Sequence, residues 1–233
     1  MALFAIGDPH LSFGANKPMD IFGSVWKDHV EKLRQGFLEQ VGPEDTVVLC
    51  GDLSWSMKLQ DCGPDFRFLN DLPGKVKLLL KGNHDYWWTT AGKMEAYFQA
   101  EGLDTFRLLH NNCWLYGETA LCGTRGWFYE LDQPGHKERN EKMLHRECIR
   151  LEASLKAAGE REKIVFLHYP PIYQGYRCQP ILRLLADYGV KRCCYAHLHG
   201  PSRRLAMEGK WEGIEFSLVS ADQLGFVPKR ILD

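Results

Sequence analysis

Residues that can bind divalent metal ions occur in six short fragments spread along the 233-residue chain. In order they are Asp8-Pro9-His10, Gly51-Asp52, Gly82-Asn83-His84-Asp85, His168, His197 and His199. Carboxylate and amide oxygens combined with imidazole nitrogens suit manganese, iron or zinc better than copper(I) or calcium. A carboxylate has two oxygens and can span two ions that are about 3.5–4 Å apart. The fragments together predict a centre for two adjacent divalent ions.

The first and last fragments share a spacing of two residues. On an extended backbone, which the intervening proline favours, Asp8 and His10 point to one face and can hold one ion. His197 and His199 repeat this spacing, with Leu198 turned to the core. Alone, the first pair also fits a polar strand end, and the second fits a hydrogen-bonded pair of core histidines. The joint presence of all six fragments favours metal binding.

The tetrapeptide Gly82-Asn83-His84-Asp85 is the most specific fragment. It follows an apolar run, so Asn83 can offer a carbonyl oxygen to a metal while His84 projects into the site. Asp85 is placed to orient the His84 imidazole. The simpler interpretation is a glycine turn in which asparagine adopts a left-handed backbone.

Apolar runs lead into these fragments, as expected for a site at the carboxyl edge of a sheet. In the first half we predict strands 3–7, 46–50 and 76–80, with helices 26–40 and 65–72 between them. This order implies parallel pairing with right-handed crossovers. In the second half we predict strands 106–109, 113–116 and 119–122, a helix carrying Leu144, Cys148, Leu151 and Leu155 and ended by Gly159, strands 163–167 and 193–195, and antiparallel strands within 203–219. The expected fold class is α/β, an α+β sandwich of two stacked mixed sheets flanked by helices.

Composition predicts one domain over residues 1–233, because 45% of the residues are hydrophobic and no linker, repeat or low-complexity run is visible. No apolar run approaches the ~20 residues that cross a bilayer, so we expect no membrane partner. A net charge of −1 argues against a general nucleic-acid binder. Eight cysteines without CxxC spacing and an N-terminus without a signal-peptide pattern favour buried thiols and a cytoplasmic location. The oligomeric state stays open.

The ordered fragments resemble the signature of the calcineurin-like metallophosphoesterase superfamily, D-x-H, G-D, G-N-H-[DE], a lone H and G-H-x-H. The strings around Gly51, Gly82, Gly123 and His168 are similar to a bacterial branch of predicted phosphohydrolases. One departure is Ala196, where the superfamily usually has glycine. The resemblance implies one ion held by Asp8, His10, Asp52 and His199, and a second held by Asp52, Asn83, His168 and His197. Asp52 would bridge the two ions.

The implied activity is a dinuclear metal-dependent phosphoesterase that hydrolyses a small-molecule phosphate ester. Hydroxide formed from a water bridging the ions would attack the phosphorus, and His84 would act as general acid or charge stabiliser, oriented by Asp85. We place a phosphodiester slightly ahead of a phosphomonoester or pyrophosphate. A non-catalytic metal-binding scaffold is the remaining alternative, disfavoured because the residue set is complete.

Substrate contacts are harder to predict. Arg125 lies in a glycine-flanked loop after a predicted strand and suits a phosphate contact, or else a surface salt bridge. Trp87 and neighbouring aromatic residues could form a wall that stacks a base or sugar, although packing of loops on the core is the simpler interpretation. Specificity is expected in loops 11–24 and 126–140.

Overall fold

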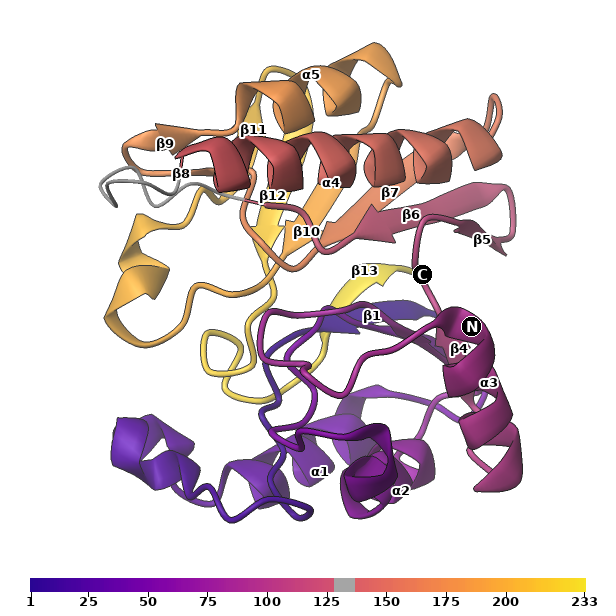
Figure 1. Cartoon of the computed structure of the whole chain (residues 1–233), viewed down its shortest axis with the longest axis vertical. Coiled ribbons are helices and arrows are strands. Elements are labelled where there is room, and N and C mark those ends of the chain that lie inside the picture. Colours follow the sequence, from indigo (N-terminus) through magenta and orange to yellow (C-terminus); the bar gives the residue numbers. More distant parts are fainter. Residues whose placement is uncertain (128–136) are drawn as a thin grey trace.

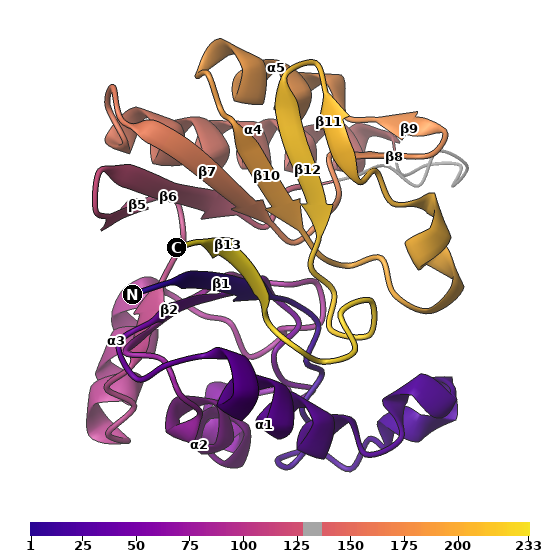
Figure 2. The same ribbon diagram turned by 180° about the vertical axis from the view of Figure 1, so that it is seen from behind.

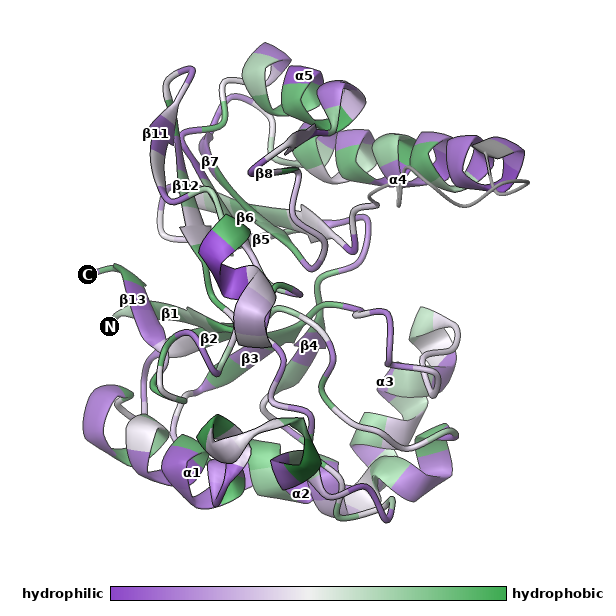
Figure 3. Ribbon diagram, turned by 90° about the vertical axis from the view of Figure 1, so that its left-hand side faces the viewer, coloured by the Kyte–Doolittle hydropathy of each residue, from purple (hydrophilic) through white to green (hydrophobic). Residues whose placement is uncertain are grey.

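The computed structural model describes residues 1–127 and 137–233, and within them two large mixed sheets lie face to face between outer helices (Figure 1). Helices α1, α2 and α3 lie on the outer side of one sheet, and α4 and α5 on the outer side of the other (Figure 3). This is the predicted sandwich. Residues 128–136, within the predicted specificity loop 126–140, lie outside the described residues.

In the first sheet the described strands follow the order β13-β1-β2-β3-β4. The strands are β1 (Leu3–Ile6), β2 (Thr46–Leu49), β3 (Val76–Leu79), β4 (Phe106–Leu108) and β13 (Lys229–Leu232). The covering helices are α1 (His29–Gln40), α2 (Gly63–Asp71) and α3 (Ala91–Ala100). Strands β1 to β3 pair in parallel, as the alternation of strand and helix predicted. Strand β4, which the sequence analysis assigns to the second half, also pairs in parallel with β3, and β13 joins β1 antiparallel (Figure 2).

In the second sheet the described strands follow the order β11-β12-β10-β7-β6-β5. They are β5 (Cys113–Tyr116), β6 (Thr119–Thr124), β7 (Glu162–Leu167), β10 (Arg192–Tyr195), β11 (Gly209–Trp211) and β12 (Ile214–Leu218), covered by α4 (Lys137–Ala157) and α5 (Gln179–Asp187). The shorter elements are the hairpin β8 (Ile172–Tyr173) and β9 (Tyr176–Arg177) and the 3-10 turns Met19–Phe22, Ser24–Trp26, Leu59–Cys62 and Gly200–Leu205. Strands β5 and β6 form the predicted hairpin, with Tyr116 opposite Thr119.

Side chains alternate between the two faces of the central strands and pack into three hydrophobic cores. In β1, Leu3 and Ala5 face the other sheet, whereas Phe4 and Ile6 face the helices. Strand β7 does the same, with Phe166 between the sheets and Val165 under α4 and α5. Strands buried on both faces read as nearly continuous apolar runs, which is why these strands were visible in the sequence.

Two predicted elements differ from the structure. Helix α1 begins at His29 rather than at Trp26, because Asp28 has a left-handed backbone (φ 54°) that separates it from a preceding 3-10 turn. The tail 203–219 begins in a 3-10 turn and then forms β11 and β12, which pair antiparallel, but β12 runs parallel to β10. Alternation predicts that one face of a strand is buried and does not say which neighbour the strand pairs with.

The eight cysteines, all within the described residues, are free thiols, and six of them are buried. Burial raises the pKa of the Cys50 and Cys193 thiols well above the ordinary value. They therefore pack as small apolar side chains. Among the described residues, no helix is both long enough and apolar enough to span a membrane.

Candidate metal centre

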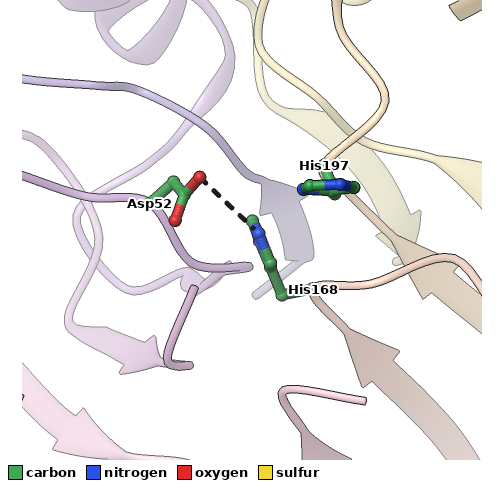
Figure 4. Close-up of side chains that lie close together, drawn as sticks. All are labelled: Asp52, His168 and His197. Carbon is green, nitrogen blue, oxygen red and sulfur yellow. Dashed lines mark ion pairs between the residues drawn. The ribbon is translucent and has the colours of Figure 1, made fainter. Parts of the chain in front are cut away.

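The proposed metal ligands lie in the segments that follow the carboxyl ends of five parallel strands. Asp8 follows β1, Asp52 follows β2 and Asn83 follows β3. From the other sheet, His168 follows β7, and His197 follows β10. Residues separated by up to 189 positions thus come together, and Figure 4 shows Asp52, His168 and His197 side by side.

The backbone at these positions is not extended, contrary to the prediction from the two-residue spacing. Asp8 and His10 have φ values of 54° and 47°, and Asp52 and His197 have 54° and 72°. The segment at Asp8 pairs with the next strand end instead, since the His10 N–H donates to the Asp52 carbonyl at 3.0 Å. Left-handed conformations in non-glycine residues are costly and cluster at functional sites.

Five buried or half-buried side chains form two groups that share Asp52. Asp8, His10 and Asp52 make one group, and Asp52, His168 and His197 make the other. In each group one potential ligand atom per residue lies within 4.8 Å of the others. Of the two further predicted ligands, His199 packs against His10 with ring centroids 5.4 Å apart and planes at 85°, and Asn83 contacts His168.

Each central carboxylate is fixed through one oxygen only. Asp8 Oδ2 accepts the His197 N–H at 2.9 Å, and Asp52 Oδ1 accepts the His84 N–H at 2.7 Å. The second oxygens, Asp8 Oδ1 and Asp52 Oδ2, are buried without a hydrogen-bond partner among the described residues, as is His10 Nε2. Buried polar atoms are rarely left unsatisfied, so these three atoms fit a bound cation.

His168 is held in an orientation that suits a ligand. Its Nδ1 lies 3.0 Å from the Cys50 carbonyl, which places the proton on Nδ1 and leaves Nε2 as an acceptor. That Nε2 lies 3.6 Å from Asp52 Oδ2 and 2.7 Å from Asn83 Oδ1. Three electron-pair donors therefore converge where a cation could bind all of them.

The electrostatics agree with this reading. Burial raises the pKa of Asp8 to about 6, and burial together with Asp85 raises that of Asp52 well above its ordinary value. Burial also lowers the pKa values of His10 and His197 well below the ordinary value. Without a cation the site disfavours every charged form, and a divalent ion would reverse this for the carboxylates.

The sequence suggested that Asp85 orients His84, but the structure gives Asp85 other partners. Both its oxygens accept backbone N–H groups, Oδ2 from Asp52 at 2.9 Å and Gly82 at 2.7 Å, and Oδ1 from Leu53 at 2.8 Å. Among the described residues no hydrogen bond joins it to His84. Asp85 instead ties the loop of Asp52 to the loop of Asn83. Gly82 permits this approach, because a Cβ there would lie 2.1 Å from Asp52 Oδ1.

His84 lies beside the two groups, in contact with Trp55. The two ring centroids are 4.4 Å apart, and the His84 and His10 rings are 5.8 Å apart. His84 Nδ1 is buried and has no hydrogen-bond partner among the described residues. Burial first, and the Lys17 ammonium second, lower the pKa of His84 to about 4.

The two predicted substrate residues differ in their surroundings. Trp87 is 2% exposed, packs on Phe66 and donates its indole N–H to Asp85 at 3.1 Å, so it belongs to the core and forms no substrate wall. The Arg125 side chain is 15% exposed and pairs with the buried Glu147 at 3.6 Å. Its carbonyl accepts the His168 N–H at 3.2 Å, so the Arg125 backbone positions a predicted ligand.

Two residues of the C-terminal segment also position the centre, and no motif pointed to them. Asp222 is buried and accepts the Gly200 N–H at 2.7 Å, which fixes the turn after His199. Ala221 donates its N–H to the Gly7 carbonyl at 2.8 Å, next to Asp8. The polar residues Ser220 and Asp222 shortly after a strand were the only available signal.

Comparison with known structures supports the fold. The chain is similar to the Aquifex aeolicus protein of unknown function AQ665, with 14% identity, a TM-score of 0.53 and coverage of 98% of this chain and 95% of that one. It is also similar to TT1561 of Thermus thermophilus, with 15% identity, a TM-score of 0.55 and coverage of 99% and 97%. No curated protein matches the chain.

A family model described as calcineurin-like phosphoesterase matches residues 1–201, and the chain belongs to this family. The family and the Asp/His groups together support a metal-dependent phosphoesterase.

Proposed function

We propose that the chain is a dinuclear phosphoesterase that hydrolyses a small phosphate ester, with a phosphodiester as the first substrate class to test. The observation that supports this most is the pair of residue groups sharing Asp52. Asp8, His10, Asp52 and His199 would hold one ion, and Asp52, Asn83, His168 and His197 the other. The ions, as manganese, iron or zinc, would supply an activated water and neutralise the phosphoryl oxygens.

His84 is the proposed group that acts on the leaving group. Its imidazole is neutral in the free site, because burial lowers its pKa to about 4. An anionic phosphate beside the ring would raise that pKa and allow the ring to carry the proton needed by the leaving alkoxide. Arg125, held by Glu147, is proposed to contact a phosphoryl oxygen through its guanidinium.

Metal analysis tests the dinuclear proposal. Active protein freed of loosely bound ions should contain close to two equivalents, and Asp52→Ala should lower the occupancy of both sites, because Asp52 belongs to both groups. Asp8→Ala, the matched control, should chiefly weaken one site. Full activity with one ion or none contradicts the proposal.

The substrate class is tested by screening. Metal-reconstituted protein would be assayed against phosphomonoesters, linear diesters, cyclic nucleotides and pyrophosphates. A phosphodiester should give the highest kcat/KM, and a higher value for a monoester or pyrophosphate would replace that preference. Metal binding without hydrolysis of any class would favour a non-catalytic scaffold.

A further inference from the structure

Lys17 is a partly buried cation beside the proposed centre, and it has no acidic partner among the described residues. Its Nζ lies 3.0 Å from the centroid of the Trp55 ring and 5.6 Å from that of Phe22. A cation–π contact is worth about 0.5–2 kcal/mol and holds the ammonium in place without neutralising it. The ammonium therefore keeps donors for another group.

The Trp55 ring contacts the Lys17 ammonium and also two histidines at the proposed centre, His10 and His84. The Trp55 ring stacks on His10, with centroids 4.9 Å apart and planes at 17°, and contacts His84 at 4.4 Å. Among the described residues, Lys17 itself contacts no proposed metal ligand. Because the Trp55 ring contacts both Lys17 and His84, a group bound to Lys17 would lie near His84.

The charge of the proposed metal centre indicates which kind of group would bind to Lys17. Two divalent ions held by Asp8 and Asp52 give a net positive centre, and an ammonium nearby is repelled by it. The repulsion is removed when an anion lies between them. A lysine at this position therefore opposes metal binding slightly and favours an anionic ligand.

We propose that Lys17 binds an anionic group on the leaving-group part of the substrate. The proposal rests on the proposed function, in which His84 faces the leaving group. It defines the substrate class as phosphate esters or anhydrides whose leaving group carries a second anion, a phosphate or a carboxylate. Lys17 would then be a specificity residue, since it distinguishes leaving groups by their charge.

Two esters that differ only in this charge test the proposal: phenyl phosphate and 3-carboxyphenyl phosphate. With metal-loaded protein, Lys17→Met should lower kcat/KM about tenfold for the carboxylated ester, the worth of one hydrogen bond to a charged group, and less than about twofold for the other. Lys17→Arg should retain most of the preference. Lys27→Met is the matched control, because Lys27 is an exposed lysine of the same region.

Binding measurements separate this proposal from the proposed function. In calorimetry, Lys17→Met should weaken inorganic pyrophosphate about tenfold and inorganic phosphate little, even if neither ester is hydrolysed. Failure of the wild-type protein to hydrolyse any ester would count against the proposed function alone. Three results for Lys17→Met would overturn the role of Lys17. They are an equal loss of kcat/KM for the two esters or of affinity for the two inorganic anions, no loss at all, and loss of the bound metal.

Discussion

At the scale of single residues, His84 is where metal binding and proton transfer can be separated. It lies outside both ligand groups, so His84→Ala should keep its metal ions. The rate on a substrate with a poor alkoxide leaving group should fall roughly 10²–10⁴-fold, the usual contribution of a positioned acid. Comparing kcat on alkyl and nitrophenyl esters checks this.

A nitrophenolate needs little protonation, so its rate should fall clearly less. Equal losses on both esters would instead indicate stabilisation of charge on the phosphoryl oxygens. Unchanged activity on both, or loss of the ions, would contradict the role proposed for His84.

Asp85 should matter through the backbone it organises. Its oxygens accept N–H groups of Asp52, Leu53 and Gly82, and an amide in Asp85→Asn would turn its own donors toward some of them. We expect a loss of about 2–3 kcal/mol in the free energy of unfolding, together with reduced metal content. Chemical denaturation and metal analysis measure the two effects. The exposed Asp104→Asn is the control, and an equally small effect in both variants would contradict this account.

At the scale of elements, the close approach of β1 and β10 depends on two small residues. A Cβ at Gly7 would lie 2.5 Å from the Cβ of Ala196. The methyl group therefore lies after β10, on Ala196, whereas Gly7 after β1 has no side chain. Gly7→Ala alone should cost about 1–3 kcal/mol by overpacking.

Combining Gly7→Ala with Ala196→Gly should recover part of that loss, because the methyl group is moved rather than added. A double-mutant cycle of unfolding free energies measures the coupling. Additive effects of the two substitutions would show that the contact does not limit the packing. The cost from Cys50, whose Cβ would lie 3.1 Å from the new methyl group, should remain.

At the scale of the whole molecule, the centre joins two sheets, so ion binding should stabilise both. Asp8 and Asp52 come from one sheet, and His168 and His197 from the other. At an ion concentration 100-fold above the dissociation constant, one site contributes about 2.7 kcal/mol. Two sites contribute about twice as much, so chelation of both ions should lower Tm by about 10–20 °C in calorimetry. Asp52→Asn should be nearly insensitive to chelation, and an equal shift in both proteins would contradict this coupling.

The sequence predicted the architecture well because buried strands are legible as apolar runs and the ligands follow them directly. It failed where contacts are non-local. The left-handed backbone at Asp8 arises from pairing with the loop of Asp52, and the role of Asp85 depends on N–H groups about 30 positions away. Trp87 was predicted as a possible substrate residue, but it is buried. Hydrophobic periodicity does not indicate which aromatic residues of a loop pack into the core.

Strand β13 has a consequence for how the protein is made. It pairs with β1, so Leu232 lies opposite Leu3, although every other described strand precedes β13 in the chain (Figure 2). During synthesis the outer edge of β1 therefore stays open until residues 229–232 have left the ribosome. An open edge strand can pair with other chains. Nascent chains paused before β13 should be those that most need a chaperone.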